Sequence, residues 1–159
     1  MRSVSAEIIT KRLLEKRGIA DQYHVFSRGM QGFAGMPAPE FDNLTKYSEL
    51  YESSRPTLER LNIDVSHHVS TPVSQEAIDQ SDVVIAFDHF ILDDYPNALS
   101  KSFPEARSKM HLFLELEGEK ESIIDPGDAP DADYHKEVFE RINRDLETHL
   151  DILLGWANA

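Results

Sequence analysis

The chain has 159 residues, about the size of one ordinary domain, which is long enough to bury a core without disulfides or metals. It contains no cysteine, which excludes disulfides, zinc–thiolate sites and thiol nucleophiles within it. The 29 acidic and 16 basic residues give a net charge of -13, which repels nucleic acid phosphates and anionic lipids. We therefore expect one domain over residues 1–159, and neither nucleic acid nor a membrane as partner.

The hydropathy of the chain bears on its location. No apolar run approaches the roughly 18 residues that a membrane span requires. The N-terminal residues also lack the apolar core of a secretory signal. We predict a cytoplasmic protein with the composition of a soluble globular domain, since 40% of the residues are hydrophobic and 28% are charged.

The first predicted element is a helix over residues 3–16. Its apolar residues recur at helical spacing, and Gly18 stops the pattern. A short apolar run at residues 23–27 then predicts a buried strand that feeds a loop. The stripe of the helix consists of Ile8, Ile9, Leu13 and Leu14.

The middle of the chain is less regular. Residues 36–55 contain two prolines and show little periodicity, so we predict a long irregular segment there. A short helix follows, with Pro56 at its start, where the missing amide hydrogen costs little. Ser74 is predicted to cap another short helix.

The second half of the chain predicts two strands and a long helix. The continuous apolar run at residues 83–87 is typical of a central strand that is covered on both faces. A helical turn follows near residues 90–95, and residues 110–116 predict a further strand. Apolar residues at helical spacing predict the final helix over residues 134–156.

Strands that alternate with helices predict an α/β fold with an open parallel sheet. Ligands of such sheets bind outside the carboxyl ends of the strands. The chemistry-bearing residues Arg2, Gly29, Asp88 and Asp125 each follow a predicted strand or begin a helix. The predicted fold therefore allows them to converge.

Several stretches of the chain also carry a family likeness. RSVSAE, VFSRG, GMPAP, IDVSHHVSTPVS, SDVVIAFD and IIDP, the last followed by a long helix, occur in this order. In that order they resemble the bacterial low-molecular-weight protein tyrosine phosphatases, over nearly the whole chain. The resemblance implies an open parallel four-stranded sheet flanked by helices. It also implies hydrolysis of a phosphotyrosine protein or a small aryl phosphate without any cofactor or metal.

The resemblance assigns roles to residues at the start of the chain. The family's catalytic loop reads CxGNxxRS and joins the first, central strand to the first helix, and Arg2 and Ser3 match its last two positions. Arg2 would then clamp the phosphate bidentately, and Ser3 would orient and stabilise the thiolate. A helix start suits this role, because its free amides and partial positive charge bind anions.

Four further residues take roles from the same resemblance. Asp125 of IIDP would be the general acid that protonates the leaving tyrosyl oxygen, and Pro126 would stiffen its loop. His68 resembles the histidine that braces the catalytic loop. Asp88 resembles the polar residue that follows the third strand.

The departures from the family pattern are equally informative. The family's first strand, its nucleophilic cysteine and the Gly and Asn of its loop would all precede Met1 in this numbering. We therefore predict an N-terminally truncated phosphatase whose sheet lacks its first, central strand. An upstream segment outside this numbering, a repacked strand or a neighbouring chain would fill that slot. A full-length form would act through a cysteinyl-phosphate intermediate, whereas this chain would be inactive. The segment of residues 40–55 is also longer than the corresponding segment usually is in the family.

Two other functions stay open at this stage. The chain would be a catalytically dead phosphatase-like binding or regulatory module if no cysteine precedes it. A thiol-dependent arsenate reductase is disfavoured, because that chemistry needs several thiols. The physiological substrate is not readable from the sequence, and a homodimer is one option for its assembly.

The histidines raise the question of a metal site. His67, His68 and His89 match no recognised ligand spacing. Adjacent histidines on an extended segment also point to opposite sides. We predict no metal.

Overall fold

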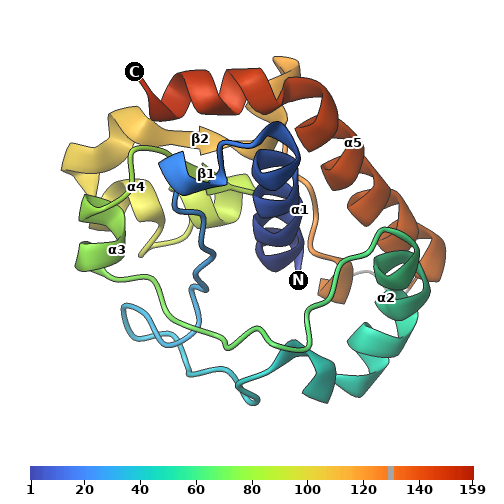
Figure 1. Cartoon of the computed structure of the whole chain (residues 1–159). Helices are drawn as coiled ribbons and strands as arrows, with labels where there is room; N and C mark the ends of the chain where they lie inside the picture. Colours follow the sequence, from blue (N-terminus) through green and yellow to red (C-terminus); the bar gives the residue numbers. More distant parts are fainter. Residues whose placement is uncertain (129–130) are drawn as a thin grey trace. The chain divides into compact units, whose positions relative to one another are not determined.

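The computed structural model describes residues 1–128 and 131–159 (Figure 1). The contacts between these residues group them into two compact units. Unit 1 comprises Met1–Arg28, Pro39–Thr71 and Asp125–Thr148. Unit 2 comprises Gly29–Ala38, Pro72–Ile124 and His149–Ala159. That residues 1–159 form one domain stays a prediction.

Unit 1 is built from helices. These are α1 (Arg2–Arg17), α2 (Ser48–Arg60) and the part of α5 (Ala132–Ala157) that precedes residue 149. The predicted helix over residues 3–16 is confirmed as α1, and Gly18 ends it in the left-handed conformation with φ 70°. Short 3₁₀ turns lie at Ala20–Gln22, Leu44–Lys46 and Pro126–Asp128. The buried apolar side chains of the unit's helices are Val4, Ile9, Leu13, Leu14, Leu58, Val138, Phe139, Ile142 and Leu146.

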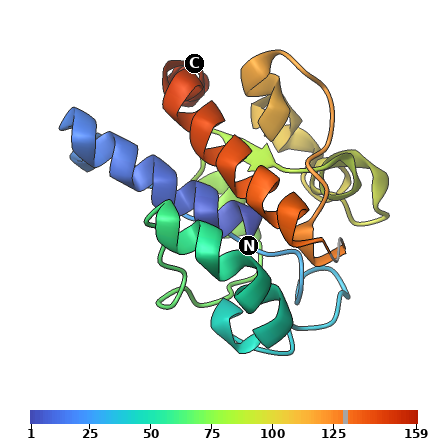
Figure 2. The same ribbon diagram turned by 90° about the vertical axis from the view of Figure 1, so that its right-hand side faces the viewer.

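Polar side chains tie the three helices of unit 1 together. The Arg12 guanidinium on α1 donates to the Leu61 carbonyl at 2.6 Å and to Asn143 Oδ1 on α5 at 2.8 Å. Ser54 on α2 and His135 on α5 are both buried and lie 3.0 Å apart, from Oγ to Nδ1. Figure 2 shows α2 running alongside α5, as these contacts require. These bonds anchor α5 to α1 and to α2.

Two predictions for unit 1 are wrong. Residues 23–27 form no strand, although the backbone at Tyr23 is extended. A strand needs a hydrogen-bonded ladder, and here the Ser27 amide donates instead to the Glu7 carboxylate at 2.9 Å. The helix expected to begin at Pro56 begins earlier, at Ser48, so Pro56 lies inside α2 and part of the supposedly irregular segment is helical. The cost of an interior proline is one lost backbone hydrogen bond.

Unit 2 contains the sheet. Strands β1 (Val84–Ala86) and β2 (Met110–Leu112) pair in parallel, with Val84 opposite Met110. Around them lie α3 (Gln75–Asp79), α4 (Leu99–Ser102), a π-helical turn at Phe90–Asp94 and 3₁₀ turns at Pro104–Lys109 and Phe113–Glu117. Ser74 caps α3 as predicted, since its Oγ accepts the Ala77 amide hydrogen at 3.1 Å. The core of the unit consists of Val73, Ile78, Ala86, Leu92, Leu99, Phe103, Ala106, Met110 and Leu112.

The fold class is α/β with a parallel sheet, as predicted, but the sheet is smaller than expected. We predicted the family's four-stranded sheet without its first strand, which would leave three. Across residues 1–128 and 131–159 the sheet has two strands. β1 pairs only with β2 there, and Val84 and Ile85 are only partly buried, so β1 is not the covered central strand that its apolar run predicts. β2 stops at Leu112 because the Leu112 amide donates to Glu115 Oε1 at 3.1 Å, which begins a 3₁₀ turn.

The long C-terminal helix is confirmed, with one departure. α5 covers the predicted residues 134–156, but His149 has non-helical angles (φ -117°, ψ 18°). α5 is therefore two helical segments joined by a kink. In the part of the chain that the structure describes, no helix is both long enough and apolar enough to cross a membrane.

The buried face of α5 generates a test of the fold. Ile142→Ala removes a fully buried side chain, so we expect a loss of about 2–5 kcal/mol in the free energy of unfolding. Ile152→Ala on the same helix is the matched control, because Ile152 is 42% exposed and its loss should cost less than about 1 kcal/mol. Urea unfolding followed by circular dichroism measures both. Equal losses would show that the assigned buried face of α5 is wrong.

Candidate active site

The site begins at the N-terminal end of α1, where a charged side chain is buried. Arg2 is the first residue of the helix, and its side chain is only 6% exposed. A buried guanidinium needs an anion, because an unpaired charge away from water is costly. Asp125 supplies it: Asp125 Oδ2 lies 2.9 Å from Arg2 Nη2, across 123 positions of sequence. The structure thus brings together the residues that the sequence proposes as clamp and acid.

The loop around Asp125 fixes the direction of its carboxylate. Asp125 Oδ1 accepts the Gly127 amide hydrogen at 2.8 Å, which closes a tight turn. Pro126 is buried and begins the 3₁₀ turn Pro126–Asp128, and its ring holds φ near one value. One oxygen of Asp125 is therefore used to shape the loop and the other faces Arg2.

The ion pair also sets the charge of Asp125. Burial alone would raise its pKa, but the Arg2 guanidinium, the N-terminal ammonium of Met1 and the Gly127 amide together hold the pKa of Asp125 below its ordinary value. Asp125 is therefore ionised at neutral pH while it faces Arg2. A carboxylate in this state accepts a proton rather than donating one.

His68 lies near the same helix start. Its side chain is half-buried, and burial lowers the pKa of His68 below its ordinary value. Glu7 opposes this shift in pKa, while the Met1 ammonium, Arg28 and Lys11 reinforce it. The imidazole is therefore neutral at pH 7 and close to the charged groups of α1.

The remaining predicted residues are placed as follows. Ser3 follows Arg2 on α1 and is partly exposed. Asp88 belongs to unit 2, where its Oδ1 accepts the Ile91 amide hydrogen at 2.8 Å and so starts the turn at Phe90–Asp94. Arg2, Ser3, His68, Asp125 and Pro126 all belong to unit 1.

A polar link between Glu7 and Ser27 lies beside the helix start, and it was not predicted from the sequence. Glu7 Oε2 accepts hydrogen bonds from the Ser27 amide at 2.9 Å and from Ser27 Oγ at 2.7 Å. Burial works to raise the pKa of Glu7, but hydrogen bonds from Lys11 and Ser27 lower it overall. Glu7 lies in the stretch RSVSAE and Ser27 in the stretch VFSRG. That both stretches carry the family likeness is the sequence feature that could have indicated the link.

Comparison with known proteins decides the family. The family model described as "Low molecular weight phosphotyrosine protein phosphatase" matches residues 1–155. The chain belongs to this family. The resemblance read from the motifs is therefore confirmed. No curated protein sequence matched the chain significantly.

Solved structures of this phosphatase family share the fold. A mutant of YwlE from Bacillus subtilis is 22% identical, with a TM-score of 0.69, over 97% of this chain and 90% of that one. The low molecular weight protein tyrosine phosphatase from T. tengcongensis is 21% identical, with a TM-score of 0.71, over 94% and 90%. The tyrosine phosphatase Wzb from Escherichia coli K30, in complex with sulphate, is 20% identical, with a TM-score of 0.68, over 96% and 90%. At these identities the likeness establishes the fold.

The ion pair at the helix start makes a prediction about charge. Replacing the guanidinium in Arg2→Met removes the attraction that lowers the pKa of Asp125 and leaves its burial in place, so that pKa should rise. Carboxyl ¹³C NMR over an acid titration measures it. Arg60→Met is the matched control, because Arg60 forms an exposed ion pair with Glu140 in the same unit. An unchanged Asp125 titration in Arg2→Met would show that the pair does not govern this carboxylate.

Proposed function

We propose that this protein is a phosphatase that cleaves phosphotyrosine, with Arg2 as the phosphate clamp and Asp125 as the general acid. A full-length form would carry a CxGNx segment before Met1, whose thiolate attacks phosphorus and forms a cysteinyl phosphate. Asp125 would give its proton to the departing tyrosyl oxygen. Water would then attack the cysteinyl phosphate, Asp125 would take up the proton released, and inorganic phosphate would leave.

The observation that carries the proposal is the buried Arg2 guanidinium facing Asp125 at 2.9 Å. Carboxylate and phosphate oxygens match the planar guanidinium in the same way, so Asp125 occupies the position that a phosphate oxygen would take. The first amides of α1 lack intrahelical partners, as in any helix, and add partial positive charge there. These groups favour a dianion over a single carboxylate.

The same geometry couples substrate binding to acid catalysis. In the resting pair Asp125 is ionised, because Arg2 holds its pKa down. A phosphate that takes over Arg2 removes this attraction and adds negative charge, and both changes raise the pKa of Asp125. Asp125 would then hold a proton only when a phosphoryl group is in place. General acid catalysis of this kind contributes roughly 10²–10⁴ in rate.

The chain with the printed sequence has no thiolate to attack phosphorus, because it contains no cysteine. We therefore expect it to bind phosphate without hydrolysing phosphate esters. That same absence favours the second candidate, a phosphatase-like module that binds a phosphorylated partner. The nucleotide sequence before the Met1 codon separates the two: an in-frame CxGNx segment supports the enzyme, and a stop codon supports the module.

The substrate and setting are part of the proposal. Among the solved relatives one is an arginine phosphatase and another is a tyrosine phosphatase. We propose phosphotyrosine, in a protein or as a small aryl phosphate, as the substrate here. A cytoplasmic location and a homodimer stay predictions.

A phosphate titration tests the function on the 159-residue chain. Inorganic phosphate should perturb the Arg2 side-chain NMR signals and raise the pKa of Asp125, and Arg2→Ala should weaken the binding by about tenfold or more. Arg60→Ala, which removes an exposed cation from the same unit, should leave the affinity unchanged.

Turnover provides the second arm of this test. The printed chain should not hydrolyse p-nitrophenyl phosphate, whereas an extended chain with the CxGNx segment should hydrolyse it and phosphotyrosine faster than phosphoarginine. Hydrolysis by the printed chain would overturn the assigned roles, because it would require another nucleophile. Failure of phosphate to reach Arg2 would overturn the clamp.

A further inference from the structure

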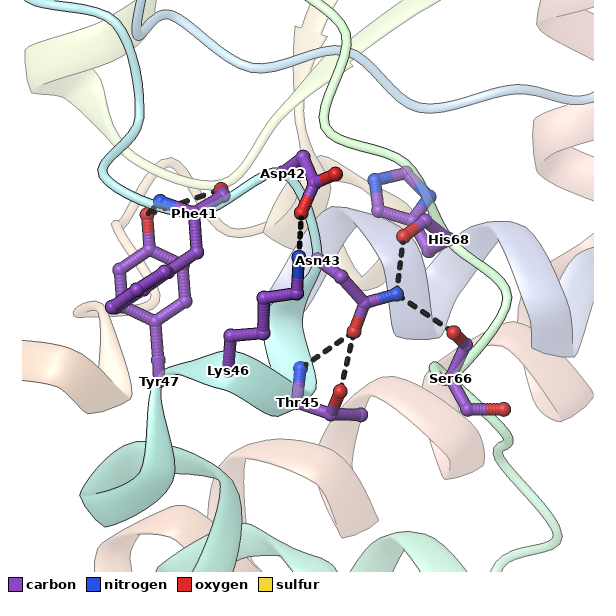
Figure 3. Close-up of polar contacts among 8 residues, drawn as sticks. All are labelled: Phe41, Asp42, Asn43, Thr45, Lys46, Tyr47, Ser66 and His68. Atoms are coloured by element: carbon purple, nitrogen blue, oxygen red, sulfur yellow. Dashed lines mark hydrogen bonds and ion pairs between the residues drawn. The ribbon is translucent and has the colours of Figure 1, made fainter.

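Residues 41–47 are fastened to the backbone around His68, and we call them the brace. They belong to the segment 40–55, which we expect to be longer than its counterpart in most family members. Asn43 is the centre of the brace, and all four hydrogen-bonding positions of its side-chain amide are used (Figure 3). Nδ2 donates to the carbonyls of Ser66 at 2.7 Å and His68 at 2.8 Å. Oδ1 accepts from the Thr45 amide at 2.9 Å and from Thr45 Oγ1 at 2.6 Å.

A backbone contact extends the same attachment. The Ser70 amide donates to the Asp42 carbonyl at 2.8 Å. These bonds reach residues 66, 68 and 70, at and just after a turn that the His68 amide closes by donating to the Val65 carbonyl at 3.2 Å. The brace therefore fastens the backbone on both sides of His68.

Contacts between Phe41 and Tyr47 join the two ends of the brace. Tyr47 Oη accepts the Phe41 amide hydrogen at 3.0 Å, and the two rings meet edge to face at 5.0 Å. Figure 3 shows Asn43 between this aromatic pair and the Ser66–His68 backbone. By contrast, the Lys46–Asp42 ion pair is exposed on both sides and is screened by water.

We propose that Asn43 is a positioning residue that holds the His68 imidazole beside the start of α1 through the carbonyls of Ser66 and His68. The inference rests on the proposed function, because the position of His68 matters to the phosphate site at that helix start. The charged groups that face His68 are Glu7 and Lys11 on α1, Arg28, and the Met1 ammonium. Asn43 contributes no charge to this set, so it acts by placement alone.

Placement of His68 has a measurable consequence. Burial is the largest cause of the lowered pKa of His68. A segment released from the brace would expose the imidazole to water, and the pKa of His68 would then rise toward that of a solvated imidazole. Loss of a purely stabilising contact elsewhere in the unit would not change this titration.

Asn43→Ser is the sharpest variant for the test. Serine still caps the turn at Leu44–Lys46 by accepting the Thr45 amide hydrogen, but it is too short to donate to both carbonyls. Thr45→Val is the matched control, because it removes one bond to Asn43 Oδ1 and keeps both bonds to the Ser66 and His68 carbonyls. Histidine ring NMR measures the titration, and the signal missing in His68→Gln identifies His68.

The proposal expects Asn43→Ser to raise the pKa of His68 and Thr45→Val to leave it as in the unmodified chain. Asn43→Ala, which also removes the cap, should raise it as well, and thermal melting verifies that each variant is folded. An unchanged His68 titration in both Asn43 variants overturns the proposal, as does an equal shift in Thr45→Val. Phosphate titration of the unmodified chain is read separately at Arg2, so a failed phosphate site is distinguished from a failed brace.

Discussion

The candidate site depends on one constraint, the burial of a guanidinium at the first residue of a helix. Arg2 is almost out of contact with water, and its charge must be balanced by an anion at close range. Asp125 meets this requirement, and its second oxygen is committed to the turn at Gly127. The position of the Asp125 loop thus follows from the charge of Arg2. In the function that we propose, a phosphate dianion of matching geometry meets the same requirement and takes the place of Asp125.

Side chains take over, around this helix start, the bonding that a strand ladder would provide. The Ser27 amide is satisfied by Glu7, and the carbonyls of Ser66 and His68 are satisfied by Asn43. Ser27 is buried and His68 half-buried, so their backbone groups must be paired, and a carboxylate or an amide serves as well as another strand. Ser66 is exposed, and water would pair its carbonyl without Asn43. Unit 1 therefore keeps the segments that carry Ser27 and His68 in place without a sheet of its own among its described residues.

Because side chains replace strand hydrogen bonds here, the sequence predicted the helices α1 and α5 well but predicted a strand at residues 23–27 that does not form. The apolar stripe of α1 and the apolar residues at helical spacing along α5 predict helices directly, because burial on one face dictates the spacing of apolar residues. The strand at residues 23–27 was predicted from apolar composition, which does not reveal whether a partner strand exists. Pro56 was placed at a helix start because an interior proline is costly, yet α2 tolerates it. Motif order, and not periodicity, put Arg2 and Asp125 in one site. No local pattern marks Asn43, since its partners are backbone carbonyls more than twenty residues away.

The two lowered pKa values of the site act in opposite directions on charge. For Asp125 the shift favours the charged form, which balances Arg2, and for His68 it favours the neutral form. A protonated His68 would add a further cation beside Arg28, Lys11 and the Met1 ammonium, and Glu7 is the carboxylate that opposes the shift. Arg2 is the strongest of the causes that lower the pKa of Asp125. In the function that we propose, a phosphate dianion displaces Asp125 from Arg2, and the displaced carboxylate then gains the affinity for a proton that an acid catalyst needs.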